Sequence, residues 1–211
     1  MRHVIVSRFS VPRPGAGTAM RHCDGAWLDS RLALFHRYFV PSVGRLGVPT
    51  VLLCSTASAE RVAAATAGLA WCTVEEQDDW RGGWSGAPDQ MVTRLDSDDA
   101  LHDGWFAALE AAAGGFEAYC TRSFLRFHPA TRSLYARSRR LPSPLAAFPG
   151  GRNPYAFDHT ELGGRYRTLM IPGCYLLQVV HGGNLSNRAP SWRHFPLRTS
   201  LARLAPFGVE P

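Results

Sequence analysis

The chain has 211 residues, of which 45% are hydrophobic and 19% charged, and its five cysteines form no C-x-x-C pair. This composition is typical of a globular protein and excludes a disordered chain, while the cysteine spacing argues against zinc ribbons and redox dithiols. All 23 basic residues are arginine: residues 1–105 carry 10 Arg against 12 acidic residues, and residues 106–211 carry 13 against 5. A basic second half could meet a phosphorylated ligand, but no RNA-binding motif or zinc finger accompanies it, so we expect no nucleic-acid partner.

No stretch of the chain approaches the roughly 18 consecutive apolar residues that a membrane-spanning helix needs. The opening residues, Met1–Arg8, do not have the pattern of a signal peptide, since their apolar run is too short. We therefore expect a cytoplasmic protein without a transmembrane segment. The length suits a single domain over residues 1–211.

The first half of the chain alternates predicted strands and helices. Apolar runs predict strands, and apolar side chains at three- and four-residue spacing predict helices. The expected strands are His3–Phe9, Thr50–Cys54, Ala70–Val74 and Gln90–Leu95. The expected helices are Trp27–Leu46, kinked or ended by Pro41, then Ala57–Leu69 and Ala100–Ala113. Residues 10–25 and the segment Glu75–Pro88, which carries Trp80 and Trp84, are expected to be loops. This alternation indicates parallel β-α-β units.

The second half contains shorter predicted strands that lie close together in the sequence. They are Phe116–Cys120, Phe124–Phe127, Leu134–Ala136, Arg167–Ile171 and Tyr175–His181. Pro142–Pro154 is expected to be a loop, and the tail from Asn187 is polar and rich in Arg and Pro. Short connections favour antiparallel pairing. The predicted fold class is therefore α/β, with a mixed, mostly parallel sheet flanked by helices and late antiparallel strands.

An acidic segment, Asp96-Ser97-Asp98-Asp99, follows the predicted strand Gln90–Leu95. Ligands of open α/β sheets collect beyond the carboxyl ends of strands, so this segment lies where a ligand would bind. Asp96 and Asp98 can offer the oxygen ligands that Mg²⁺ or Mn²⁺ prefers. The alternative is that Ser97, Asp98 or Asp99 caps a helix that starts near Ala100. An EF-hand is excluded, because Leu101 and Ala107 stand where its glycine and its last glutamate would be.

Four sequence motifs together resemble those of a bacterial family of rhamnosyl transferases. They are Val6-Ser7-Arg8-Phe9-Ser10, the pattern W-x3-R-x3-F-x2-Y-x2-P-S from Trp27 to Ser42, Thr93-Arg94-Leu95-Asp96-Ser97-Asp98-Asp99-Ala100-Leu101, and Gln178-Val179-Val180-His181-Gly182-Gly183-Asn184-Leu185-Ser186-Asn187. The resemblance implies a GT-A-type fold of the Rossmann kind and a glycosyltransferase that uses a nucleotide-diphosphate sugar as donor. Rhamnose is the sugar that the family name suggests, and the acceptor stays unknown.

The resemblance also implies roles for individual residues. Asp96 and Asp98 match the metal motif, and His181 matches a late histidine that completes the coordination of Mn²⁺ or Mg²⁺. The residues implied in donor binding are Arg8, Phe9, Arg31, Arg94, Asp96, Ser97 and Asp98. Guanidinium groups bind phosphate bidentately, although each of these arginines could instead be an ordinary ion-pair partner. His181 could likewise be a histidine that is hydrogen-bonded at the end of a strand.

An inverting transferase also needs a carboxylate to deprotonate the acceptor hydroxyl. After Glu117 the chain offers Asp158, Glu161 and Glu210, so Asp158 and Glu161 are candidates by elimination, and Asp99 is another. Asp158-His159-Thr160-Glu161 also has the spacing of a helix capping box. Two other functions stay open: a non-catalytic sugar- or nucleotide-binding protein with the same fold, and a metal-dependent phosphoesterase.

Overall fold

The structure is a computed structural model that describes residues 1–12, 25–112, 114–138, 142–181 and 197–210. The predicted loop at residues 10–25 therefore lies largely outside the described residues, as do Cys23 and the motif from Gly182 to Asn187, and the tail from Asn187 is described only from Leu197 onward. No helix in the described ranges is long and apolar enough to cross a membrane. Within the same ranges Cys54, Cys72, Cys120 and Cys174 are free thiols.

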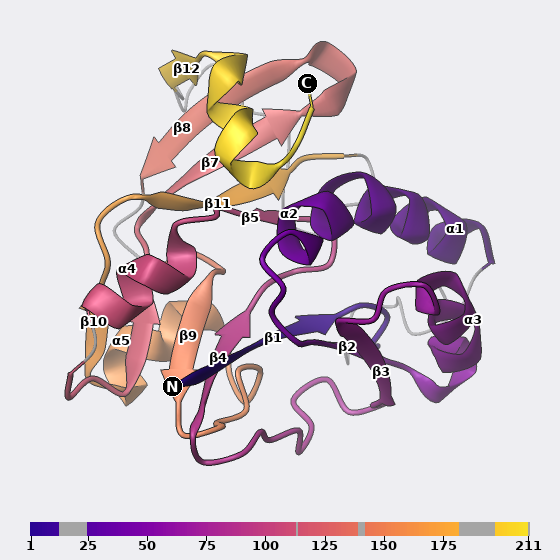
Figure 1. Ribbon diagram of the computed structural model, residues 1–211, viewed down its shortest axis with the longest axis horizontal. Coiled ribbons are helices and arrows are strands. Elements are labelled where there is room, and N and C mark those ends of the chain that lie inside the picture. Colours follow the sequence, from indigo (N-terminus) through magenta and orange to yellow (C-terminus); the bar gives the residue numbers. More distant parts are fainter. Residues whose placement is uncertain (13–24, 113, 139–141, 182–196, 211) are drawn as a thin grey trace.

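A seven-stranded sheet forms the centre of the molecule (Figure 1). Its strands, in the order β10-β6-β9-β4-β1-β2-β3, are β10 (Thr168–Met170), β6 (Ala118–Cys120), β9 (Ala146–Pro149), β4 (Gln90–Arg94), β1 (Arg2–Arg8), β2 (Thr50–Cys54) and β3 (Cys72–Glu76). The four strands from β4 to β3 run parallel to one another, and β9 runs antiparallel to both of its neighbours. The predicted mostly parallel sheet is therefore confirmed.

Helices cover one face of this sheet. They are α1 (Gly25–Leu34), the π-helix η2 (Phe35–Phe39), α2 (Val40–Gly44), α3 (Thr56–Thr66) and α4 (Trp105–Ala111). Their buried side chains, among them Phe35, Val62 and Trp105, form one core with Ile5 and Leu52 of the sheet. The predicted kink near Pro41 takes the form of the π-helix just before it. A widened turn there is a common way to relieve the clash of a proline ring with the preceding turn.

The opposite face of the sheet is covered mostly by loops. Val4, Val6 and Val92 pack there against Tyr155, with Trp80 and Trp84 at the edge of the cluster. Further along, the short helices η4 (His159–Glu161) and α5 (Leu162–Arg165) lie over β6 and β9, where Leu162 contacts the core formed with Phe148. Loops in place of helices leave room for a cavity on this face.

A second, five-stranded sheet follows the order β12-β8-β7-β11-β5. Its strands are β12 (Leu197–Thr199), β8 (Ser133–Ser138), β7 (Ser123–His128), β11 (Cys174–Val179) and β5 (Ala100–Leu101). The 3-10 helix η3 (Pro129–Thr131) turns the chain between β7 and β8, and η6 (Leu201–Phe207) packs on the sheet through Leu204 and Phe207. Figure 1 shows β7, β8, β12 and η6 at the top of the molecule, away from β1–β3. The predicted late antiparallel pairing is confirmed for β7 and β8, and β5 and β12 add antiparallel pairs with β11 and β8. The late strands β7 and β11 run parallel, as do β6 and β10.

The predicted helix over Ala100–Ala113 begins late. Ala100 and Leu101 form β5, pair with β11 and are fully buried, and α4 starts only at Trp105 after Gly104. The apolar spacing of Leu101, Trp105 and Leu109 fits a helix, but pairing with a distant strand overrides this local preference. Ser97, Asp98 and Asp99 therefore do not cap a helix, and that interpretation was wrong.

Candidate functional site

The strand order places a crevice between β1 and β4. From β1 the chain proceeds outward to β2 and β3 on one side, whereas β4 lies on the other side of β1. In parallel sheets the carboxyl ends of two such strands open a ligand-binding crevice, because their connections leave in opposite directions. Arg8 ends β1 and Arg94 ends β4, so both arginines lie at this point, as the sequence predicted.

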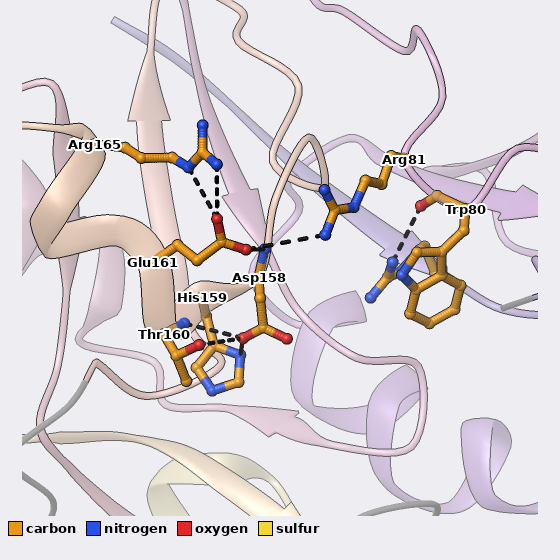
Figure 2. Close-up of polar contacts among 8 residues, drawn as sticks. Trp80, Arg81, Asp158, His159, Thr160, Glu161 and Arg165 are labelled. Carbon is orange, nitrogen blue, oxygen red and sulfur yellow. Dashed lines mark hydrogen bonds and ion pairs between the residues drawn. The ribbon is translucent and has the colours of Figure 1, made fainter. Parts of the chain in front are cut away.

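A cavity of about 330 Å³ opens at the crevice on the loop-covered face of the sheet. It is lined by Arg8, Asp79, Trp80, Arg81, Arg94, Tyr155, Phe157 and Asp158. Figure 2 shows Trp80 and Arg81 on one side of the Asp158–Glu161 turn. Three guanidinium groups against two carboxylates, with aromatic rings between them, suit an anionic ligand that also carries a flat or apolar part.

Two of the cavity arginines are placed by aromatic rings. The Arg8 guanidinium carbon lies 3.4 Å from the ring centroid of Trp80 and 4.1 Å from that of Tyr155, and Arg8 Nη1 donates to the Trp80 carbonyl oxygen at 3.2 Å. The Arg94 guanidinium carbon lies 4.6 Å from the Tyr155 ring centroid. Arg94 is only 6% exposed, and its buried Nε has no hydrogen-bond partner within the described ranges. A buried polar group without a partner is costly, so an anionic ligand at this point would satisfy it.

Tyr155 joins the two strands at the crevice. Its hydroxyl lies 3.1 Å from the Val6 carbonyl oxygen and 3.3 Å from that of Leu95, and it accepts a hydrogen bond from the Arg8 backbone N–H at 3.2 Å. Burial, and then the charge of Asp96, raise the pKa of Tyr155 to about 12, so it stays a neutral phenol. The sequence did not predict Tyr155, because it lies in a loop without periodicity. For the cavity as a whole, the sequence signal was the pair Trp80 and Trp84, two large aromatic residues in an otherwise polar loop.

The acidic segment after β4 forms an ion-pair network with helix α1 and with the end of β11. Arg31 Nη1 lies 2.5 Å from Asp98 Oδ2, and Arg31 Nε donates to Ser97 Oγ at 3.0 Å. His181 Nε2 lies 2.9 Å from the same Asp98 oxygen. Burial raises the pKa of Asp98, but the charge of Arg31 and the hydrogen bond with His181 outweigh it and lower the pKa overall. The structure thus brings together Arg31, Ser97, Asp98 and His181. The sequence had identified all four as candidate site residues, and they come from three distant segments of the chain.

Asp99 points in a different direction. Its Oδ1 accepts the Val179 backbone N–H at 3.0 Å, so it ties the acidic segment to β11 just before His181. Burial first, and then repulsion by Asp98 and Asp96, raise the pKa of Asp99 well above its usual value. The geometry gives Asp99 a structural role. As a fully buried carboxyl, it is poorly placed to reach an acceptor.

The predicted metal ligands are only partly assembled. Asp98 and His181 are in contact, and they offer an oxygen and a nitrogen donor that suit Mn²⁺. Among the residues that the structure describes, however, no three His, Cys, Asp or Glu side chains converge as a metal-binding group, so Asp96 does not complete one. Mg²⁺ and similar ions commonly bind one or two carboxylates together with substrate phosphates, and a two-donor protein site fits that pattern.

Phe9 is placed away from the crevice. Its side chain is buried in the helix-covered core, with its ring centroid 5.5 Å from that of Phe35. The alternation of side chains along β1 explains this placement, because Val4, Val6 and Arg8 point to the loop-covered face and Phe9 to the other. The side chain of Phe9 is therefore not positioned to contact a donor in this cavity.

Asp158 and Glu161 form the capping box that their spacing predicted. The Asp158 carboxylate accepts the Thr160 backbone N–H at 3.0 Å, and Glu161 Oε1 accepts the Asp158 backbone N–H at 3.3 Å. Glu161 also pairs with Arg165 at 2.8 Å and with Arg81 at 3.9 Å, as Figure 2 shows. Glu161 is thus fully engaged, whereas Asp158 caps the turn and also lines the cavity.

Replacing Asp158 separates its capping role from a catalytic one. Burial raises the pKa of Asp158, but hydrogen bonds from Thr160 and the charges of His159 and Arg94 lower it overall, which weakens it as a base. We expect Asp158→Asn, which can keep the cap, to retain stability, and Asp158→Ala to lose about 1 kcal/mol of unfolding free energy. Urea denaturation measures this difference. If the asparagine variant keeps its cap and its turnover of donor, Asp158 is not the base.

Fold and crevice together define an α/β protein with a ligand cavity at the switch point of its parallel strands. No family model and no curated protein sequence matches the chain. Among solved structures, the chain is similar to S. aureus TarS 1-349 in complex with UDP-GlcNAc, with a TM-score of 0.47 and 9% identity over 87% of this chain. It is also similar to S. aureus TarS 1-349 alone, with a TM-score of 0.43 and 9% identity over 85% of this chain. The chain spans 60% of each TarS structure.

Proposed function

We propose that this protein is a metal-dependent glycosyltransferase of the GT-A type that transfers a sugar from a nucleotide-diphosphate donor. The observation that carries the proposal is Arg94, a buried guanidinium whose Nε lacks a hydrogen-bond partner within the described ranges, at a cavity beyond the carboxyl ends of β1 and β4. Arg8 and Arg81 line the same cavity. A diphosphate is a multiply charged group whose oxygens can accept two parallel hydrogen bonds from a planar guanidinium, so such arginines bind it well.

The cavity arginines would act on the leaving group. When the bond between sugar and diphosphate breaks, negative charge grows on the diphosphate, and fixed positive charges stabilise that state. Arg8 is held between Trp80 and Tyr155, so its charge is fixed before the ligand arrives. Trp80, the partly exposed aromatic residue of the cavity lining, offers apolar surface for the nucleoside or the sugar.

Asp98 and His181, with Asp96 nearby in sequence, would hold a Mn²⁺ or Mg²⁺ ion. Such an ion supplies further positive charge to the diphosphate. Asp158 is the carboxylate that lines the cavity and is the best placed of the predicted bases, although its capping hydrogen bonds compete with that role. Rhamnose as the sugar follows from the motif resemblance alone, and the acceptor is unknown.

A panel of nucleotide diphosphates and their sugar conjugates tests the proposal. We expect at least one of the uridine, thymidine, guanosine or adenosine diphosphates to raise the melting temperature in the presence of Mn²⁺, because a ligand that binds the folded state stabilises it by mass action. The matching sugar conjugate should then be hydrolysed slowly, and faster once an acceptor is found. Binding without any hydrolysis or transfer would instead indicate a non-catalytic nucleotide-binding protein. No thermal shift with any nucleotide would refute both.

A further inference from the structure

One carboxylate oxygen of Asp98, a predicted metal ligand, is already engaged by two other side chains of the protein. Asp98 Oδ2 lies 2.5 Å from Arg31 Nη1 and 2.9 Å from His181 Nε2. Arg31 is fixed further by its bond to Ser97 Oγ, so one guanidinium is held by two neighbouring residues of the acidic segment. The exposed fractions of the Asp98 and Arg31 side chains are 6% and 15%, and solvent therefore screens this pair only weakly.

A divalent ion and the Arg31 guanidinium would compete for this oxygen. An ion that arrives alone must break a short charge-assisted hydrogen bond and leave the guanidinium without its anion in a largely buried position, which is costly. A diphosphate changes this balance, because it brings negative charge for the ion and offers Arg31 new oxygens that can accept two hydrogen bonds from its guanidinium. Arg31 extends from α1 to the acidic segment that follows β4, and Arg94, the last residue of β4, lines the cavity. The exchange therefore requires Arg31 to move from Asp98 toward a diphosphate that Arg94 binds.

We propose that Arg31 occupies Asp98 until the donor diphosphate draws it away, so that divalent ion and nucleotide diphosphate bind this protein as a mutually dependent pair. The inference rests on the proposed function, because it requires a diphosphate at the crevice. Arg31 is then a positioning residue that sets the order of assembly and is not a metal ligand. By linkage, each ligand tightens the binding of the other by the same factor, which for such couplings is typically about 5- to 150-fold.

Titration of Mn²⁺, followed by the electron paramagnetic resonance signal of the free ion, tests this coupling without any catalytic readout. The probe is Mn²⁺ with and without the diphosphate that gives the largest thermal shift in the panel above, starting with UDP, corrected for Mn²⁺ bound by the nucleotide in solution. We expect the wild type to bind Mn²⁺ about tenfold or more tightly with the diphosphate than without it. Arg31→Gln should bind Mn²⁺ alone about tenfold more tightly than the wild type and lose most of the coupling.

Arg37→Gln is the matched control, because it makes the same change at an exposed position six residues further along the same helical stretch, where the guanidinium lies over the Tyr38 ring. It should behave as the wild type. Arg31→Lys keeps a cation at Asp98 and should keep the low affinity for Mn²⁺ alone, which makes the test independent of whether the glutamine variant folds.

Two results would overturn the inference: a wild type that binds Mn²⁺ equally tightly with and without diphosphate, or a folded Arg31→Gln variant with the full coupling. An Arg31→Lys variant that binds Mn²⁺ alone as tightly as the wild type does with diphosphate would also contradict it. Failure of the proposed function is distinguishable, because then no nucleotide of the panel shifts the melting temperature at all.

Discussion

Replacing Arg94 with alanine should weaken binding of the nucleotide diphosphate by about 2–3 kcal/mol, or roughly 30- to 150-fold, since hydrogen bonds to charged groups contribute at the upper end of the usual range. Arg94 is buried at the end of β4, and its Nε has no partner within the part of the chain that the structure describes. The Nε–H of Arg94 can therefore donate a hydrogen bond to a ligand. Isothermal titration calorimetry with the best diphosphate of the panel measures the loss.

The fold should survive this substitution. Arg94 is not paired in a short salt bridge with a described carboxylate, so its removal leaves no buried charge behind. Arg94→Lys keeps the charge but loses the fork geometry, and we expect an intermediate affinity. Arg2→Ala is the control, because Arg2 lies at the other end of β1 in an exposed pair with Asp89. Unchanged affinity in a folded Arg94→Ala protein would remove the observation on which the proposed function depends.

Asp98→Ala should have the second large effect, on stability and on metal-linked binding together. It leaves the Arg31 guanidinium, 15% exposed, without its carboxylate and takes the His181 contact away. Breaking a buried ion pair by removing one partner costs about 3–5 kcal/mol. We therefore expect a clear loss of unfolding free energy in urea, and no Mn²⁺-dependent increase in nucleotide affinity.

A double variant separates these two effects. In Arg31→Ala/Asp98→Ala no buried charge is left unpaired, so part of the lost stability should return, while metal-linked binding should stay absent. Asp103→Ala removes an exposed carboxylate 3.9 Å from Arg45 and should change stability by less than about 1 kcal/mol. Mn²⁺-enhanced nucleotide binding that persists in the folded double variant would show that Asp98 holds no metal.

The local pattern of the sequence determined the parallel half of the fold and part of the site. Short apolar runs separated by amphipathic stretches predict β1, β2 and β4 to within one or two residues. The position of an acidic segment directly after β4, and of Arg8 at the end of β1, follows from the same pattern. The spacing of Asp158 and Glu161 likewise predicted the capping box. These features depend on neighbours within a few residues, and such neighbours are visible in a linear chain.

Only the tertiary structure decided which of these residues meet. Ala100 and Leu101 have helical spacing but form β5, because β11, more than 70 residues away, offers a strand to pair with. β9 formed within a proline-rich segment that was expected to be a loop, because β4 and β6 flank it. Two further contacts join distant loops or a strand end to a loop: that of His181 with Asp98, and that of Arg8, at the end of β1, with Trp80 and Tyr155. Loop residues have no periodicity, and their positions depend on the whole sheet beneath them, so no local pattern encodes these contacts.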